Sequence, residues 1–313
     1  MITTTPGGGK VGRFRLVERA RAAGAQVRLS GPDQDAASLA RGAVAEGAVV
    51  LGVAGGDGTV SAVAAVAAEA RRPLVVIPAG TRNHFARDLG LDLSNPASAL
   101  AALGAGDAVP VDLGWVGSRV FVNNVSFGAY ADALVTPGYR EAKARTFVQI
   151  APGYLDGQQC VDAVVDTPQG RVESPQVVLV SNNPYHISTL RYLGRRFALD
   201  TGQLGGIVLK RPAGAPPPDL LARLRRELRR HGRAGPGEGV VTWTAARITL
   251  RGSTSHGSVA QLPAGIDGEA VLLDLPVVCE IRPGALRVLL PRRRPGIPTE
   301  PAARPARPAA TGT

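Results

Sequence analysis

The sequence predicts an α/β protein with a parallel-sheet N-terminal domain, followed by a second domain that resembles a β-sandwich. Strand-like and helix-like segments alternate over residues 1–108, which is typical of a parallel sheet covered by helices. From 109 to 291 the apolar segments are short, β-branched and separated by Gly, Pro and Asn, which indicates antiparallel strands. Residues 292–313 are rich in Pro, Arg and Ala, so we expect a disordered basic tail.

The first domain follows from apolar periodicity and from glycines that end helices. Its opening, "MITTTPGGG", leaves room for only a short first strand. After it we expect helices over 11–24, 35–46 and 60–70, alternating with strands over 25–30, 48–54 and 73–79.

The second domain is predicted to be mostly sheet, interrupted by two helices. One helix is expected over 137–155, and the other, over 219–230, places leucines on one face and arginines on the rest. The last strand could return to the first domain. Strands are expected over 109–116, 119–127, 160–167, 170–183, 205–212, 245–252, 270–283 and 285–291.

Charge and cysteine content narrow the function classes. The net charge is +11, and residues 219–233 and 292–313 carry +4 each, which suggests an anionic surface as partner or, equally, a solvated basic face. Cys160 and Cys279 have no partner at metal-ligand spacing, so we interpret both as core residues. The sequence contains no secretory signal and no apolar run of about 18 residues, so a cytoplasmic location is expected.

A glycine-rich turn, "GGDGT" at 55–59, joins a buried strand to an alanine-rich helix. Such a turn presents backbone N–H groups to phosphate, and the helix dipole favours the anion. Two well-known phosphate-binding patterns are not met in this chain. In the opening stretch, Lys10 is followed by Val11 and not by Ser or Thr, which excludes a Walker A loop. After the turn at 55–59, Ser61 stands where a dinucleotide-binding fold would have its third glycine.

Asp57 is the unusual member of this turn, because a carboxylate repels phosphates unless a cation lies between them. Mg²⁺ bridging carboxylate and phosphate oxygens is the common solution. The alternative is that Asp57 caps the next helix through its side-chain oxygen.

A second polar loop, "PAGTRNHFARDLGL" at 78–91, follows the next strand at the same edge of the sheet. Thr81 and Asn83 can hydrogen-bond a nucleotide, and Arg82 and Arg87 can neutralise phosphate, although each arginine alone could be a surface charge. Further along the chain, Asp267 and Glu269 stand two residues apart, so on an extended segment both would face one cleft. The alternative, favoured if "DGE" stood alone, is a polar Asp in a β-turn beside an exposed Glu.

These motifs, together with "VDLGWV" at 111–116, "LDTGQLGG" at 199–206 and "DGE" at 267–269, resemble the diacylglycerol kinase catalytic family, which includes bacterial lipid kinases and sphingosine kinases. The resemblance covers about residues 5–291. It implies a nucleotide-binding α/β domain over 1–108 and a lipid-substrate domain over 109–291, with ATP and lipid meeting between them.

The resemblance also implies the roles of individual residues. Glu269 would accept the proton of the lipid hydroxyl, with Asp267 beside it, and Asp57 would help to coordinate Mg²⁺. Asp200 would remain from a second Mg²⁺ site. The ATP-binding residues would be Ser30, Gly55, Gly56, Asp57, Gly58, Thr59, Thr81, Asn83 and Arg87.

The chain departs from the family pattern at several positions, among them Ser61 and Ala62, where Asn and Glu are frequent, and two positions of the expected metal sites. His84 stands where the family commonly has Asp, and Thr201 replaces an Asp before Gly202. The sequence-based hypothesis is an ATP- and Mg²⁺-dependent lipid kinase that binds an anionic membrane surface peripherally. A catalytically weakened nucleotide-binding regulator and an NAD kinase-like enzyme are the alternatives. Scarce aromatics, 4% of residues, argue against nucleic acid, and the sequence is compatible with a homodimer.

Overall fold

The computed structural model describes residues 2–4, 9–31, 34–128, 159–186, 194–210, 239–253 and 260–296. The helices expected over 137–155 and 219–230, and the tail beyond residue 296, lie outside these ranges. Within them, no helix combines the length and apolarity needed to cross a bilayer.

The N-terminal half contains the predicted parallel sheet, with strand order β2-β1-β3-β4 and all neighbours parallel. The chain expected to form one helix over 11–24 forms two, because Arg15 takes a left-handed conformation with φ of 49°. The strands are β1 (Ile2–Thr4), β2 (Arg28–Ser30), β3 (Leu51–Gly55) and β4 (Leu74–Pro78). The helices are α1 (Gly9–Arg13), α2 (Leu16–Ala22), α3 (Ala36–Ala45), α4 (Asp57–Glu69), α5 (His84–Asp88), 3₁₀ helix η1 (Pro96–Ala101) and α6 (Ala102–Ala105).

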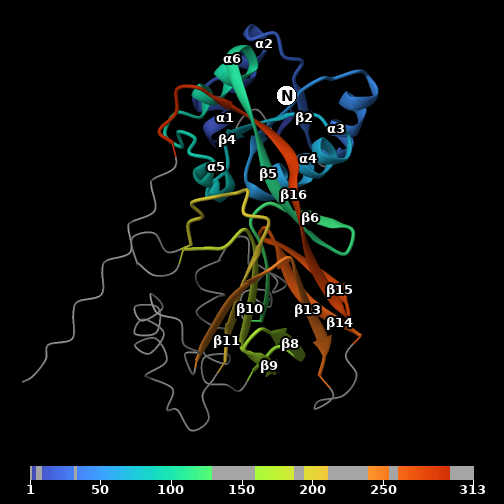
Figure 1. Ribbon diagram of the computed structural model, residues 1–313. Coiled ribbons are helices and arrows are strands. Elements are labelled where there is room, and N and C mark those ends of the chain that lie inside the picture. The colour runs from blue at the N-terminus through green and yellow to red at the C-terminus, as the bar shows by residue number, and fades with distance from the viewer. Residues whose placement is uncertain are drawn as a thin grey trace, which may run out of the picture.

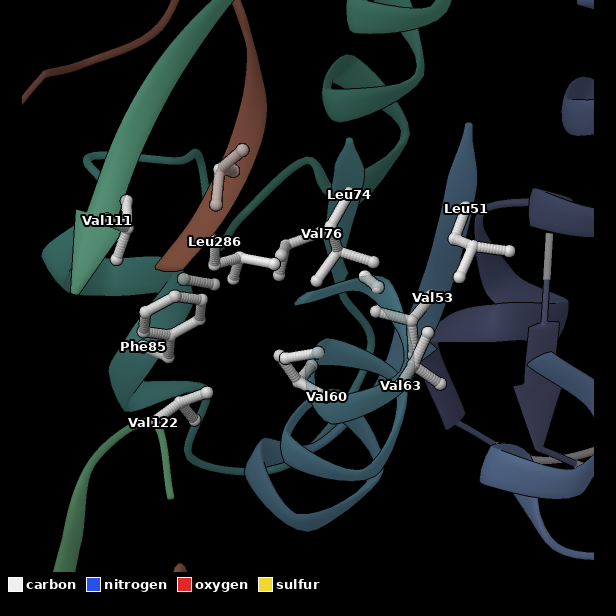
Figure 2. Packing of buried hydrophobic residues seen from close by; sticks show 14 of the residues in the cluster. Leu51, Val53, Val60, Val63, Leu74, Val76, Phe85, Val111, Val122 and Leu286 are labelled. Carbon is white, nitrogen blue, oxygen red and sulfur yellow. The ribbon is translucent and has the colours of Figure 1, made fainter. Parts of the chain in front are cut away.

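Helices cover both faces of this sheet, which explains why β3 and β4 read as continuous apolar runs. Alternate strand residues point to opposite faces. Leu74 and Val76 of β4 pack in the cluster that contains α3 and α4, whereas Val75 and Ile77 pack against α1, α2 and η1. Figure 2 shows the first cluster, in which Phe85 of α5 packs among the buried side chains.

In the ranges that the structure describes, the second half is mostly strand, as predicted for those residues. A separate six-stranded antiparallel sheet has the order β12-β11-β10-β7-β14-β15. The sequence did not suggest β12 or β14. The strands are β5 (Gly106–Val116), β6 (Arg119–Phe121), β7 (Asn124–Gly128), β8 (Ala163–Thr167), β9 (Gly170–Glu173), β10 (Val177–Asn182), β11 (Leu204–Leu209), β12 (Val240–Ala245), β13 (Arg247–Gly252), β14 (Gln261–Ile266), β15 (Glu269–Asp274) and β16 (Val277–Pro291).

The long strand β16 connects the two halves (Figure 1). It pairs with β13 at one end and runs parallel to β4 at Val288, so the first sheet extends to ten strands and includes β8, β9 and β13. Strand β5 pairs with β16 along its length, with a register shift between Arg282 and Leu286. The last strand therefore returns to the first sheet.

The six-stranded sheet packs against the β16-β13-β8-β9 part of the ten-stranded sheet. The apolar core between them includes Phe121, Phe127, Val178 and Leu250. Cys279 is buried in this core, as predicted, and burial raises the pKa of its thiol to about 12. The prediction was wrong for Cys160, which is partly exposed. The α/β half followed by a β-sandwich-like half confirms the predicted fold class.

Candidate active site

The glycine-rich loop lies at the carboxyl end of β3, where the chain turns directly into α4. The Gly55 carbonyl accepts a hydrogen bond of 3.0 Å from the N–H of Gly80, in the loop after β4. A Cβ built on Gly80 would lie 2.7 Å from the Gly56 nitrogen, so a side chain cannot be accommodated there. The two predicted loops are therefore in direct main-chain contact.

Asp57 joins these loops through its carboxylate. Its Oδ2 accepts the N–H of His84 and its Oδ1 accepts the N–H of Phe85, both at 3.1 Å. Asp57 thus caps α5 and not α4, the helix that it begins. Its side chain stays 12% exposed, and a carboxylate offers about four acceptor positions, so about two remain for a ligand.

His84 lies beside this carboxylate, with its Nδ1 3.8 Å from Oδ2 of Asp57. Burial lowers the pKa of His84, although the negative charge of Asp57 acts in the opposite direction. His84, which departs from the family pattern, therefore donates its main-chain N–H to Asp57, the candidate metal ligand, and its imidazole lies beside the same carboxylate.

The second loop uses its predicted residues unequally. Asn83 is 3% exposed and has φ of 53°, and its amide closes the loop on Gly80, accepting the N–H at 2.9 Å and donating to the carbonyl at 2.6 Å. Thr81 is exposed. Arg87 donates through Nε to Asp88 and through Nη2 to the Gly194 carbonyl at 2.7 Å, so it connects α5 to the second half.

Glu269 reaches the glycine-rich loop from the second half of the chain. A Cβ built on Gly58 would lie 2.6 Å from Glu269 Oε1 and 3.2 Å from its Cδ, so the carboxylate lies over the first turn of α4. Glu269 is exposed, and within the described ranges its side chain makes no hydrogen bond or ion pair. The structure thus brings together the two motifs that the sequence separates most widely.

Asp267 has a different place from the one its spacing suggested. It does not lie on an extended segment with Glu269. Asp267 and Gly268, with φ of 47° and 89°, form the two-residue turn between β14 and β15. The carboxylate of Asp267 accepts three backbone N–H groups at 2.8–3.0 Å, from Val122, Asn123 and Asn124. The geometric reason for pairing the two carboxylates was therefore wrong.

The environment of Asp267 favours its neutral form. Burial raises the pKa of this carboxyl to about 6, and the backbone hydrogen bonds from Val122, Asn124 and Asn123 limit the rise. These bonds also tie the β14–β15 hairpin to the segment between β6 and β7. Asp267 thereby positions the strand that begins with Glu269.

A cavity of about 400 Å³ opens beside Gly58 and Glu269, between α4, β6 and the β14–β15 hairpin. Its wall is largely small and apolar along α4, and two arginines contribute positive charge. The polar or charged side chains that line it belong to Arg41, Ser61, Glu69, Ser118, Arg119, Asp267 and Glu269.

Ser30 and Asp200 lie apart from this cluster. Ser30 ends β2, so it lies at the carboxyl edge of the parallel sheet, with β1 between it and β3. Asp200 is exposed, and the adjacent Thr201 donates its hydroxyl to Asn183 at 2.7 Å. In the part of the chain that the structure describes, no three His, Cys, Asp or Glu side chains gather as a metal site.

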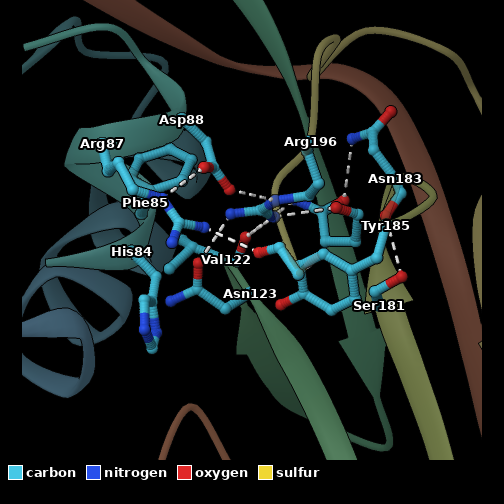
Figure 3. Close-up of polar contacts among 12 residues, drawn as sticks. His84, Phe85, Arg87, Asp88, Val122, Asn123, Ser181, Asn183, Tyr185 and Arg196 are labelled. Carbon is cyan, nitrogen blue, oxygen red and sulfur yellow. Dashed lines mark hydrogen bonds and ion pairs between the residues drawn. The ribbon is translucent and has the colours of Figure 1, made fainter. Parts of the chain in front are cut away.

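Sequence reasoning missed Arg196, a fully buried arginine between the two halves (Figure 3). Its Nε donates to Asp88 Oδ2 at 2.8 Å, and its other nitrogens donate to the carbonyls of Val122 and Asn182 and to Oδ1 of Asn123. Burial alone would lower the pKa of Arg196, but Asp88 raises it, and the net shift is upward. No motif or periodicity distinguishes Arg196 from the adjacent Arg195.

Asp112 was also missed, although a signal existed. Its carboxylate is 1% exposed and accepts the N–H groups of Gly202 and Gly284 at 2.7 and 2.8 Å. It stands inside the apolar run of β5, and a charge in such a run indicates a buried carboxylate with fixed partners.

The parallel sheet, its glycine-rich strand-to-helix turn and the β-rich half that supplies an opposing carboxylate define a two-part α/β protein of the lipid kinase type. Comparisons with known proteins agree. The family model of the diacylglycerol kinase catalytic domain matches residues 7–116. A Pseudomonas aeruginosa protein described as "probable lipid kinase YegS-like" is 30% identical over 280 residues, covering 86% of this chain and 85% of that protein. The chain therefore belongs to the diacylglycerol kinase catalytic domain family.

Two further matches are consistent with this assignment. A diacylglycerol kinase of Mycobacterium tuberculosis is 42% identical over 86 residues, 28% of either chain. A crystal structure of a diacylglycerol kinase from Bacillus anthracis superimposes with a TM-score of 0.62 at 17% identity, covering 92% of this chain and 95% of that one. At that identity the second match supports the fold alone.

Proposed function

We propose that the protein transfers the γ-phosphate of ATP to a hydroxyl group of diacylglycerol or a related lipid. The observation that carries the proposal is the position of the Glu269 carboxylate over Gly58, at the start of α4. Phosphoryl transfer needs a bound triphosphate, charge neutralisation and a group that takes the proton of the attacking hydroxyl. The glycine-rich turn is the candidate for binding the triphosphate and Glu269 is the candidate for taking the proton, and the two lie side by side.

In this proposal the turn from Gly55 to Thr59 holds the phosphates through its backbone N–H groups. Helix α4 spans 13 residues, so its dipole adds positive potential at the same point. The adjacent cavity, lined by Gly58, Arg41 and Arg119, gives the rest of the nucleotide a place beside the loop. Ser30 and Thr81, at the same edge of the sheet, remain proposed nucleotide contacts.

Asp57 is the residue that we propose for Mg²⁺. Its oxygens fit a hard cation, its orientation is fixed by the N–H groups of His84 and Phe85, and its side chain stays partly exposed. A bound Mg²⁺ would neutralise charge on the phosphates, and phosphate and water oxygens would supply its remaining ligands. The exposed Asp200 gives no such support, so a second metal site there stays a sequence prediction.

Glu269 is the proposed proton acceptor. Its carboxylate is exposed and makes no hydrogen bond or ion pair within the described part of the chain, so either oxygen is able to accept the proton of a lipid hydroxyl. Asp267 supports this role indirectly, because its three backbone hydrogen bonds fix the turn that precedes Glu269.

We also propose that the protein meets its lipid at an anionic membrane surface. The support is the charge of +4 over residues 219–233, which lie outside the described part of the chain. Basic residues near an anionic bilayer each contribute on the order of 1 kcal/mol to binding. Changing Arg225, Arg226, Arg229 and Arg230 to Glu should strongly reduce sedimentation with phosphatidylglycerol-containing vesicles, and unchanged sedimentation would remove this role.

The proposed function is tested with purified protein, ATP, Mg²⁺ and a panel of acceptors. Diacylglycerol, a long-chain base and NAD serve as the three acceptor classes. Transfer to a lipid but not to NAD supports the proposal, and transfer to NAD alone would make the protein a soluble dinucleotide kinase. ATP binding without transfer to any acceptor would favour a regulatory protein, in keeping with His84 and Thr201.

A further inference from the structure

Arg196 occupies the junction between the two halves of the candidate active site. Its side chain is fully buried, and its guanidinium makes four hydrogen bonds of 2.6–2.8 Å. A buried charged group is costly unless all its hydrogen bonds are made, so a chain retains it where its partners must stay together. The partners of Arg196 lie on α5, on the segment before β7 and at the end of β10.

The first connection leads from Arg196 to Asp57. Asp88, the acidic partner of Arg196, is the last residue of α5, and Asp57 binds the N–H groups of the first two residues of that helix. Helix α5 has five residues, too few to be stable without tertiary contacts. Asp57 and Arg196 therefore hold opposite ends of one short helix.

The second connection leads from Arg196 to Glu269. Its Nη1 donates to the Val122 carbonyl at 2.6 Å, and its Nη2 donates to Asn123 Oδ1 at 2.6 Å. The N–H groups of the same two residues, and that of the next, donate to Asp267, which begins the turn into Glu269. Asp267 thus accepts the N–H groups of the 122–124 segment, while Arg196 donates to acceptor oxygens of the same segment.

We propose that Arg196 is a positioning residue that fixes the phosphate-binding loop with Asp57 relative to the strand end with Glu269. The proposal rests on the proposed function for the roles of those two carboxylates. An arginine suits this place because its planar fork donates in several fixed directions, whereas a lysine ammonium cannot reach all four acceptors from one point. The Tyr185 ring, 5.6 Å from the guanidinium carbon, limits its movement further.

The first test needs no activity. Hydrogen exchange followed by mass spectrometry compares the wild type with Arg196→Lys, and Arg247→Lys is the matched control, since Arg247 pairs with Glu280 on the exposed surface. We expect faster exchange in peptides covering both 80–90 and 119–128 in Arg196→Lys, and in neither for the control. Faster exchange in only one peptide, or in none, would overturn the coupling.

The second test separates positioning from general loss of structure. In Arg196→Lys we expect kcat to fall by about tenfold or more, while the KM for ATP changes little, because small displacements of reacting groups reduce rates strongly. In a Glu269→Gln background the same substitution should cause no further loss, since the group that it positions is already inactive. Additive losses would contradict the proposal.

Two further outcomes, a variant that does not fold and a wild type without lipid kinase activity, still leave the proposal testable. If Arg196→Lys does not fold, Asp88→Asn replaces it, because the amide keeps one acceptor oxygen for Arg196 but removes the opposite charge and the acceptor of Arg87; both peptides should again exchange faster. If the wild type transfers no phosphate to any lipid, the proposed function fails, yet the exchange experiment still decides whether Arg196 couples the two segments.

Discussion

The carboxylate of Glu269 lies over Gly58, close enough that a Cβ on Gly58 would come within 2.6 Å of Oε1. Gly58 belongs to the first turn of α4 in the parallel-sheet half, and Glu269 begins β15 in the β-rich half. A glycine at this position therefore leaves space where the two halves meet, and that space adjoins the cavity assigned to the nucleotide.

Gly58→Ala should reduce transfer without unfolding the protein. The atom in the way is the end of a flexible side chain, so Glu269 can turn aside, and alanine is a better helix former than glycine. We expect an unchanged or higher midpoint in thermal unfolding and a kcat reduced by about tenfold or more. Gly104→Ala, where a Cβ meets nothing within 4 Å, is the control. Wild-type kcat in Gly58→Ala would contradict the assigned position of Glu269.

Asp57→Ala should lose the Mg²⁺ dependence of nucleotide binding and destabilise the protein by about 1 kcal/mol, because α5 loses its cap. Asp35→Ala is a matched control, since Asp35 caps α3 through the Ser38 N–H at 2.7 Å. Titration with a fluorescent ATP analogue, with and without Mg²⁺, distinguishes the two. Equal loss of nucleotide affinity in both variants would show that the loss in Asp57→Ala comes from removing a helix cap and not from removing a Mg²⁺ ligand.

Asp267 should make stability depend on pH. Because the folded state raises its pKa from 3.8 to about 6, the folded protein binds the proton more tightly than the unfolded chain does. The stabilisation from this proton is complete below about pH 4 and is lost as the pH rises through 6.

Denaturant unfolding of the wild type and Asp267→Asn at several pH values measures this effect. The difference in unfolding free energy, wild type minus variant, should fall by about 2–3 kcal/mol between pH 4 and 7, because asparagine does not titrate. A difference that is independent of pH would show that burial does not raise the pKa of this carboxyl.

The fold was largely predictable because its strongest signals are local. Buried strands such as β3 and β4 appear as apolar runs, and the glycine turn at 55–58 marks the strand-to-helix junction. Strand β14 was missed because Pro263 is unfavourable inside a strand, whereas β12 was missed although its Val, Thr and Trp residues favour strands. The division of the helix at Arg15, which has φ of 49°, was also missed.

The site was predictable where a motif marks it and not where long-range contacts build it. Asp57 and Glu269 stand in recognisable patterns. The functions of Asp267 and Arg196 depend on which groups lie opposite them, and most of those partners are more than 70 residues away along the chain; the Asn182 carbonyl, 14 residues from Arg196, is the exception. Spacing alone suggested that Asp267 and Glu269 share an extended segment; Asp267 instead lies in a tight turn with positive φ, and its carboxylate accepts backbone N–H groups of the β6–β7 segment at the border of the same cavity.

The rate of ATP-dependent lipid phosphorylation by wild type and Glu269→Gln, measured alongside ATP affinity, tests the central claim most directly. Glu173→Gln, an exposed substitution on β9, serves as the matched control. We predict that Glu269→Gln binds ATP as the wild type does and phosphorylates lipid about 100-fold or more slowly, because a proton acceptor contributes at least that much. Wild-type turnover by Glu269→Gln would contradict the account.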